Sequence, residues 1–418
     1  MLNTNKKIVN SLQKITFFTF YFFLAVVILI NVFILLSGRT YLYKGIRNTY
    51  FKGQFSPSIY ELDIFSYKTI EKAQNNTAWL VSKNFNSQFI SSKDKYFMKQ
   101  LKTSAFLVFK DDSLVFEHYS EKHSIHTVSN SFSAAKTLVG LLIGIAIEEG
   151  KIKSLDEPVG NYLPEFFKHG KGRITIRHLL IMASGLDWEE SASNPLSENA
   201  ESYYGSDLYG LATRQKVIAK PGEIFKYQSG NSQLLAFVLE KATGWSVSDY
   251  AEEKIWKRME TEQNAYWSLD KEFGDEKAFC CVYATARDFG RLGKLILQKG
   301  RWKTRQIIPE WYMDELFKVP NLETEEGVPN KRYAMHIWTY LGGKEPVYYC
   351  RGIKGQYIIS IPSEKIVIVR LGLKRLDNFV FQKEKMQDKK YCEENIAKVG
   401  HPADFFEFLR IGRTIAQQ

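Results

Sequence analysis

Disulfide and metal-binding patterns are almost missing from this sequence. Its 418 residues include only 4 cysteines, which are too few for a disulfide framework and match no zinc-ligand spacing. Two of them, Cys280 and Cys281, are neighbours, and we expect them to pack rather than to react. His123 and His126 form the nearest thing to a metal pair, but they lack a third ligand and are interpreted as solvated surface residues. The sequence predicts no metal site.

Acidic residues are missing from the first 52 positions, which carry seven cations. The net charge of +11 is therefore concentrated at the N-terminus, and no basic stripe or nucleic-acid motif follows it. Cations in that place favour anionic lipid headgroups. We expect a membrane partner and no nucleic-acid partner.

Charged residues are also missing between positions 15 and 36, a nearly unbroken apolar run. A helix that spans a bilayer needs about 20 such residues, whereas a cleaved signal peptide has a shorter apolar core and a small-residue cleavage site. The run predicts a single-pass transmembrane anchor at 15–37, with a basic tail at 1–14 before it. A stalk and N-terminal extension are expected at 38–100. Three cations precede the run and four follow it, so the charge count does not fix its orientation.

A Gly-x-Ser-x-Gly nucleophile elbow is missing as well, which disfavours an α/β-hydrolase. A different serine motif is present: Ser133 and Lys136 open an apolar helix that ends at Gly150. A helix places residues i and i+3 on one face, burial lowers the pKa of a lysine, and a nearby base activates a serine hydroxyl. The motif indicates a serine hydrolase. The alternative is a polar helix turn with a solvated lysine.

The spacing Ser-x-x-Lys has little weight by itself, because the sequence contains it four times, starting at Ser11, Ser92, Ser133 and Ser268. Three of these matches lie in basic, charged or acidic surroundings. Only Ser133 follows a strand-like hairpin and begins an apolar helix, so its context distinguishes it.

Two further segments carry residues suited to acyl transfer. Tyr227 and Ser229 follow a Pro-Gly turn and precede a helix. A lysine ammonium near the Tyr227 hydroxyl would favour the phenolate, although an aromatic that packs the loop is the alternative. Ile353 lies between glycines just before a strand, where its N–H could join that of Ser133 as an oxyanion hole. The alternative there is an ordinary bulge or turn.

Strands are expected at both ends of the folded region, with helices between them. Strands near 105–109, 114–119, 347–350, 356–361 and 366–371 frame a mainly helical stretch from 133 to about 317, and a last helix covers 404–416. Layer rules place this order in the α+β class, as an antiparallel sheet flanked by helices plus a helical lobe. A catalytic cleft is expected between the two lobes.

Five blocks, taken in order, resemble the β-lactamase-related serine hydrolases. Among these enzymes the chain is most similar to the 6-aminohexanoate-dimer hydrolase and esterase branch, related to class C β-lactamases and D-Ala-D-Ala peptidases. The resemblance implies a β-lactamase/transpeptidase-like domain at 101–418. The blocks are Ser-Phe-Ser133-Ala-Ala-Lys136, the segment from Ile176 to Trp188, Phe225-Lys-Tyr227-Gln-Ser229-Gly, Ala286-Arg-Asp288-Phe and Gly352-Ile353-Lys-Gly355-Gln356.

The resemblance implies a role for each matching residue. Ser133 matches the acylated nucleophile and Lys136 its general base. Tyr227 matches the tyrosine that moves protons between the serine, the leaving group and the hydrolytic water. The N–H groups of Ser133 and Ile353 match the oxyanion hole, and no metal or cofactor is required.

Two positions depart from the β-lactamase pattern. Ser229 stands where class C β-lactamases have Asn, and Gly-Ile-Lys-Gly, ending at Gly355, replaces a Lys-Thr-Gly or His-x-Gly block. Both positions match substrate-binding positions of the amide and ester hydrolase branch. Arg351 and Lys354 could hold a substrate carboxylate, but solvated charge is the simpler interpretation.

The sequence as a whole implies a membrane-anchored serine hydrolase that acts on a small amide, ester or peptide, with its catalytic domain outside the cytoplasm. A D-Ala-D-Ala carboxypeptidase- or endopeptidase-like cell-wall enzyme is one alternative. A catalytically silent penicillin-binding-like module is the other.

Overall fold

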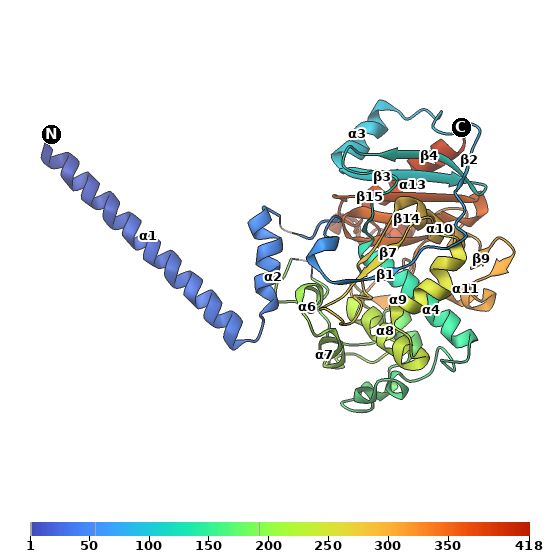
Figure 1. Cartoon of the computed structure of the whole chain (residues 1–418), viewed down its shortest axis with the longest axis horizontal. Helices are drawn as coiled ribbons and strands as arrows, with labels where there is room; N and C mark the ends of the chain where they lie inside the picture. The colour runs from blue at the N-terminus through green and yellow to red at the C-terminus, as the bar shows by residue number, and fades with distance from the viewer. Residues whose placement is uncertain (1, 55, 192) are drawn as a thin grey trace.

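A seven-stranded sheet forms the centre of the domain (Figure 1). The computed structural model describes residues 2–54, 56–191 and 193–418. The strand order is β12-β13-β14-β15-β3-β4-β2, and every neighbouring pair is antiparallel except β2 with β4. The strands are β2 (Leu80–Val81), β3 (Thr103–Lys110), β4 (Ser113–Tyr119), β12 (Trp338–Tyr340), β13 (Val347–Gly352), β14 (Gln356–Ile361) and β15 (Ile366–Gly372).

Helices cover both faces of this sheet, which explains why the central strands β3, β14 and β15 are buried at nearly every position. Successive side chains of a strand point to opposite faces. In β15, Val367 and Val369 pack in the cluster that includes α10 (Ala286–Leu297), while Ile366 and Ile368 pack in the cluster that includes α13 (Ala403–Ala416). Full burial of such a side chain stabilises the fold by about 1.5–3 kcal/mol. The α+β architecture expected from the sequence is confirmed.

In the sequence, the helical lobe comes between the first strands of this sheet and its last strands. Its centre is α4 (Ala135–Glu148) packed on α8 (Ser229–Thr243). α4 is apolar on nearly all sides, as expected for a helix enclosed by others, and α8 ends at Gly244, whose φ of 76° forms a left-handed cap. The other helices of the domain are α3 (Ser92–Gln100), α5 (Ile176–Leu180), α6 (Glu198–Tyr204), α7 (Leu208–Thr213), α9 (Val247–Ala251), α11 (Glu310–Leu316) and α12 (Lys389–Asn395).

Part of the segment expected to form a stalk and N-terminal extension packs on the domain. β1 (Tyr67–Ile70) pairs with β7 (Ala265–Ser268) in a second sheet of order β1-β7-β8-β5. Ile59 and Trp79 are buried in the main core. This packing is hard to predict from the sequence, because the segment has no clear periodicity and the partners of β1 lie about 200 residues away. The other short strands are β5 (Ser129–Asn130), β6 (Ile224–Phe225), β8 (Val282–Ala284), β9 (Arg301–Trp302), β10 (Arg305–Gln306) and β11 (Glu323–Thr324).

The N-terminal helix α1 (Leu2–Leu36) projects away from the domain (Figure 1). Its segment Leu12–Leu36 is long and apolar enough to cross a membrane, and its side chains are mostly exposed, as with Phe18 at 75%. A core helix of a soluble protein would be buried by its neighbours instead. The helix α2 (Tyr41–Asn48) follows after four residues.

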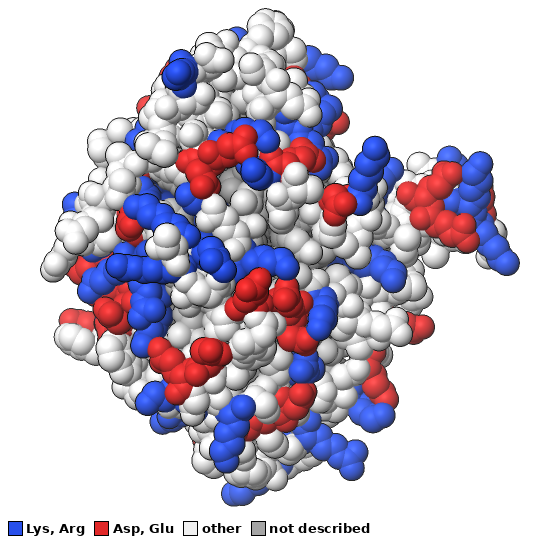
Figure 2. All heavy atoms as spheres, turned by 90° about the vertical axis from the view of Figure 1, so that its right-hand side faces the viewer, with Lys and Arg blue, Asp and Glu red and all other residues white. Residues whose placement is uncertain are grey.

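Charges of both signs are interspersed on the face of the domain that is turned away from α1 (Figure 2). Exposed ion pairs of the domain include Lys299–Asp314 at 2.8 Å and Lys220–Glu223 at 2.6 Å. Each such pair contributes about 0–1 kcal/mol to stability.

The contact between α4 and α11 leaves no room for a methyl group at Gly144. A Cβ there would lie 2.3 Å from Tyr312 Cδ1, and Tyr312 is fixed because its hydroxyl donates to the Gly140 carbonyl at 2.5 Å. We predict that Gly144→Ala lowers the free energy of unfolding by about 1–3 kcal/mol, although alanine favours a helix. Urea unfolding of the full chain in detergent measures this. Gly172→Ala is the control, because its Cβ would meet only Phe166 O at 3.8 Å; equal midpoints for the two variants would contradict the prediction.

Candidate active site

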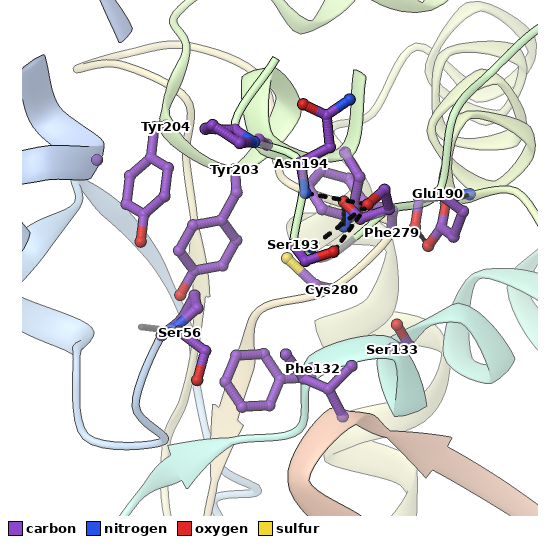
Figure 3. Close-up of a pocket in the computed structure, with 18 of the residues that line it drawn as sticks. Ser56, Phe132, Ser133, Glu190, Ser193, Asn194, Tyr203, Tyr204, Phe279 and Cys280 are labelled. Atoms are coloured by element: carbon purple, nitrogen blue, oxygen red, sulfur yellow. Dashed lines mark hydrogen bonds between the residues drawn. The ribbon is translucent and has the colours of Figure 1, made fainter. Parts of the chain in front are cut away.

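Ser133 lies on a tight turn between strand β5 and helix α4. The turn Phe132–Ala134 is a short 3-10 helix, so α4 itself begins at Ala135. Phe132 has a φ of 45°, a left-handed conformation that costs a non-glycine residue about 1–3 kcal/mol. Its N–H donates to Asn130 Oδ1 at 2.8 Å, which holds the turn in place. The Ser133 side chain lies at the pocket wall (Figure 3).

Lys136 is 1% exposed and donates three hydrogen bonds from Nζ. They go to Ser133 Oγ at 3.0 Å, to Ser229 Oγ at 3.0 Å and to the Phe279 carbonyl at 2.7 Å. Burial disfavours the ammonium form and lowers the pKa of Lys136 to about 8, while the negative charge of Glu190 opposes that shift. The amine is therefore able to lose its proton near neutral pH.

Tyr227 is partly buried beside the same pair. Its ring centroid lies 5.1 Å from Lys136 Nζ, and its hydroxyl is close enough to Ser133 for that side chain to act on its pKa. Burial raises the pKa of Tyr227, and the charge of Glu190 raises it further. The expectation that the lysine would favour a phenolate is therefore wrong: Tyr227 is a neutral phenol, a group that carries a proton to donate.

Glu190 is a member of this cluster that sequence reasoning missed. Its Oε1 accepts from the Ser229 hydroxyl at 2.6 Å, and its Oε2 accepts from the Ser229 N–H at 2.6 Å and from Trp188 Nε1 at 3.0 Å. Ser229 therefore connects the carboxylate of Glu190 to the amine of Lys136. The only sequence signal was the position of Glu190 two residues beyond the block that ends at Trp188.

The loop that carries Glu190 is fastened to the loop that carries Tyr227. Gln228 is buried, and its Nε2 donates to the carbonyls of Leu186 at 2.7 Å and Trp188 at 3.0 Å. The indole of Trp188 covers Gly230, where a Cβ would lie 2.4 Å from the ring. The glycine of the Tyr-Gln-Ser-Gly block thus allows α8 to approach this loop.

The end of strand β13 brings Ile353 to the same pocket. Gly352 lies directly against the serine turn, since a Cβ there would meet Ser131 O at 2.2 Å. Ile353, the next residue, lines the pocket together with Ser133. The structure therefore brings together the two residues whose N–H groups were predicted to form an oxyanion hole.

Gly355 does not line this pocket among the described residues, contrary to its predicted substrate-binding role. It has a φ of 81°, and a Cβ there would lie 2.3 Å from a guanidinium nitrogen of Arg370. Arg370 is buried and donates to the carbonyls of Lys354 and Gly355, each at 2.7 Å. Gly355 is explained by this packing rather than by contact with substrate.

The cleft at Ser133 has a volume of about 430 Å³. It opens between the helical lobe, the end of β13 and the segment after α1, which matches the cleft expected between two lobes. Figure 3 shows Ser133 and Phe132 on one side, Glu190 and Phe279 on a second, and Tyr203 with Tyr204 on a third.

Cys280 and Cys281 are joined by a disulfide, a bond that the sequence did not predict. Both are buried, and Cys280 lines the pocket (Figure 3). The disulfide directly follows Phe279, whose carbonyl holds Lys136. The pair therefore restricts the loop that provides one of the three lysine acceptors.

His123 is buried rather than solvated, which corrects the interpretation of the histidine pair. Its Nδ1 shares a hydrogen bond of 3.0 Å with the Tyr60 hydroxyl, and its ring stacks on Tyr119. Within the part of the chain that the structure describes, no group of three or more His, Cys, Asp or Glu residues is placed to hold a metal.

Comparison with known proteins agrees with this geometry. The model of the Beta-lactamase family matches residues 92–391. The chain belongs to the beta-lactamase family. It therefore has the β-lactamase/penicillin-binding-protein fold, with an N-terminal apolar helix in addition.

Relatives within the family have several activities. The chain is 25% identical over 287 residues to 6-aminohexanoate-dimer hydrolase of Paenarthrobacter ureafaciens, covering 65% of this chain and 72% of that protein. It is 26% identical over 250 residues to teichoic acid D-alanine hydrolase of Staphylococcus aureus, covering 54% and 58%. A solved structure from Bacillus anthracis, provisionally named a 6-aminohexanoate-dimer hydrolase, superposes with a TM-score of 0.66 at 22% identity, covering 81% of this chain and 92% of that one.

The protonation of Lys136 predicts how activity depends on pH. A lysine that takes a proton from Ser133 must be neutral, so kcat/KM for p-nitrophenyl acetate should rise with pH with an apparent pKa of about 8. Glu190→Gln removes the charge that raises the pKa of Lys136, so the rising limb should move to lower pH. Glu189→Gln is the matched control, because Glu189 is exposed. A limb that stays in place in Glu190→Gln would contradict the link between Glu190 and Lys136.

Proposed function

We propose that this protein is a membrane-anchored serine hydrolase that cleaves an amide or ester through an acyl-enzyme on Ser133. The observation that carries the proposal is the cluster of Ser133, Lys136 and Tyr227 at the cleft, in which Lys136 Nζ donates to Ser133 Oγ and lies 5.1 Å from the centroid of the Tyr227 ring. A serine, a buried amine with a lowered pKa and a neutral phenol are the three groups that acyl transfer needs. A silent binding module has no need of all three in contact.

Acylation follows from these positions. Neutral Lys136 accepts the proton of Ser133 as Oγ attacks the substrate carbonyl, and the N–H groups of Ser133 and Ile353 stabilise the oxyanion. Tyr227 donates its proton to the leaving alcohol or amine. It then regains a proton from Lys136, because both side chains lie next to Ser133. In the second half, a water takes the place of the leaving group and attacks the acyl carbonyl carbon while it passes a proton to the same pair. The bond from that carbon to Ser133 Oγ then breaks, the pair returns the proton to Oγ, and the acid is released.

The catalytic assignment predicts the effect of three substitutions. Ser133→Ala should abolish acylation and leave the melting temperature nearly unchanged, because the turn keeps its backbone hydrogen bonds. Lys136→Ala and Tyr227→Phe should each lower kcat/KM for p-nitrophenyl butyrate by a factor on the order of 10² to 10⁴, the usual contribution of a positioned acid or base. Full activity in any one of them would remove that residue from the mechanism.

We predict that the enzyme hydrolyses simple esters faster than β-lactams. The Ser229 hydroxyl donates to Glu190 and accepts from Lys136, so it is occupied at the position where class C β-lactamases present an Asn side chain. A β-lactam held without this contact would be misaligned, and a misplacement of about 1 Å can cost roughly 10²-fold in rate. The comparison is kcat/KM for p-nitrophenyl butyrate and for nitrocefin on one preparation. Faster turnover of nitrocefin would favour a β-lactamase.

We also propose that Leu12–Leu36 anchors the protein and that the catalytic domain lies outside the cytoplasm, in the periplasm where the cell has an outer membrane. Support comes from the length and exposure of this helix and from the family resemblance, since the flanking cations do not decide the orientation. Alkaline phosphatase fused after Thr40 should be active, and a cytoplasmic fluorescent reporter fused there should be dark. The reverse pattern would place the domain in the cytoplasm.

A further inference from the structure

The wall of the catalytic cleft begins just beyond the end of the apolar helix. α1 ends at Leu36, and α2 begins at Tyr41. Tyr41, Leu42 and Ile46 of α2 line the same cleft as Ser133. Five residues of extended chain reach at most about 18 Å, so this wall lies at or just outside the headgroup layer if α1 spans the bilayer.

Hydrogen bonds hold α2 both to the cleft and to α1. Arg39 Nη1 donates to the Leu196 carbonyl at 2.9 Å, and the Tyr41 hydroxyl donates to the Pro195 carbonyl at 3.1 Å. On the other side, the Tyr43 hydroxyl donates to Asn31 Oδ1 at 2.8 Å, inside the apolar segment of α1. The helix is therefore a bridge between the anchor and the pocket rather than a flexible tether.

The side of the cleft nearest the anchor is apolar and aromatic. Leu42 and Ile46 of α2 line the cleft. Tyr203 and Tyr204 of α6 line it as well (Figure 3). Gly45 allows α2 to lie close to α6, since a Cβ there would meet the Tyr204 ring at 3.4 Å. This surface suits an alkyl chain that enters from the lipid layer.

Two arginines line the cleft without an acidic partner. Among the described residues, neither Arg351 nor Arg375 forms a salt bridge within 4 Å, and their side chains donate to neutral groups: Arg351 to Gly400 O at 2.8 Å and Arg375 to Asn378 Oδ1 at 2.7 Å. Burial lowers the pKa of Arg375, and the charge of Arg351 lowers it further, so the two guanidinium groups repel each other. An anion between them would relieve that repulsion, and guanidinium groups bind phosphate and carboxylate well.

We infer that the substrate is an anionic amphiphile held in the membrane, with its acyl bond at headgroup level: its apolar part enters along α2 and its anionic group binds Arg351 and Arg375. This inference rests on the proposed function, for which it names the substrate class. Ser133 Oγ would form the acyl bond as the bond from the carbonyl carbon to the headgroup oxygen breaks. The headgroup alcohol then leaves with the proton of Tyr227, and water releases the acid. The Arg351 side chain is therefore not a merely solvated charge.

The test compares acetate esters whose alcohol part is either dissolved in water or held in the bilayer. The full chain is reconstituted in phosphatidylcholine vesicles, and acetate release is measured from triacetin in solution, from acetyl diglyceride in the bilayer and from O-acetyl phosphatidylglycerol in the bilayer. We expect kcat/KM to rise in that order. p-Nitrophenyl acetate tests the proposed function separately, because the hydrolase proposal fails if this ester is not cleaved. If p-nitrophenyl acetate and triacetin are both cleaved and neither bilayer ester is preferred, only the inference about the substrate class is overturned.

Two pairs of variants separate the anionic and the apolar contacts. Arg375→Gln should lower the ratio of O-acetyl phosphatidylglycerol to acetyl diglyceride turnover by about tenfold, while Lys374→Gln, an exposed neighbour outside the cleft, should leave that ratio unchanged. Ile46→Gln should lower the preference for acetyl diglyceride over triacetin. Its control is Ile218→Gln, the same chemical change at a residue that is 63% exposed and lies outside the cleft. Equal ratios within either pair would overturn the corresponding contact.

Discussion

The burial of a single amine constrains most of the site. A lysine removed from water needs an acceptor for each of its N–H groups, because an unpaired polar group in the interior costs free energy. Lys136 obtains three acceptors, and each comes from a different part of the chain: the turn before α4, the first residue of α8 and the loop that follows β7. These elements must therefore meet at one point, and the cleft forms where they do.

The same burial makes Lys136 useful, and Glu190 limits the effect. Desolvation alone would push the pKa of the amine further down, whereas the nearby charge of Glu190 raises it. The result is a base whose pKa of about 8 lies close to working pH, where a general base is most effective. Burial acts in the opposite direction on Tyr227 and keeps its phenol neutral. One environment therefore supplies both a proton acceptor and a proton donor.

Local sequence patterns predicted the helices and strands well, but they could not predict long-range contacts. The strand at 356–361 and the helix after Ser229 are visible in apolar periodicity and turn residues, and they appear as β14 and α8. Ser133 and Lys136 were found because helical spacing brings them together, and Tyr227 was found because its block resembles a motif of the family. Glu190 was not found, because its contact with Ser229 depends on how two loops pack against each other. Gly355 was misassigned because its neighbour Arg370, which explains it, belongs to the next strand.

The central claim is that Ser133 is the nucleophile activated by Lys136. The most direct measurement is intact-mass and peptide mass spectrometry of the full chain after reaction with a serine-directed fluorophosphonate, carried out at several pH values. We expect one adduct, on the peptide that contains Ser133, and we expect it to form faster as Lys136 loses its proton near pH 8. An adduct on Ser229 instead, or labelling at Ser133 that does not depend on pH, would contradict it.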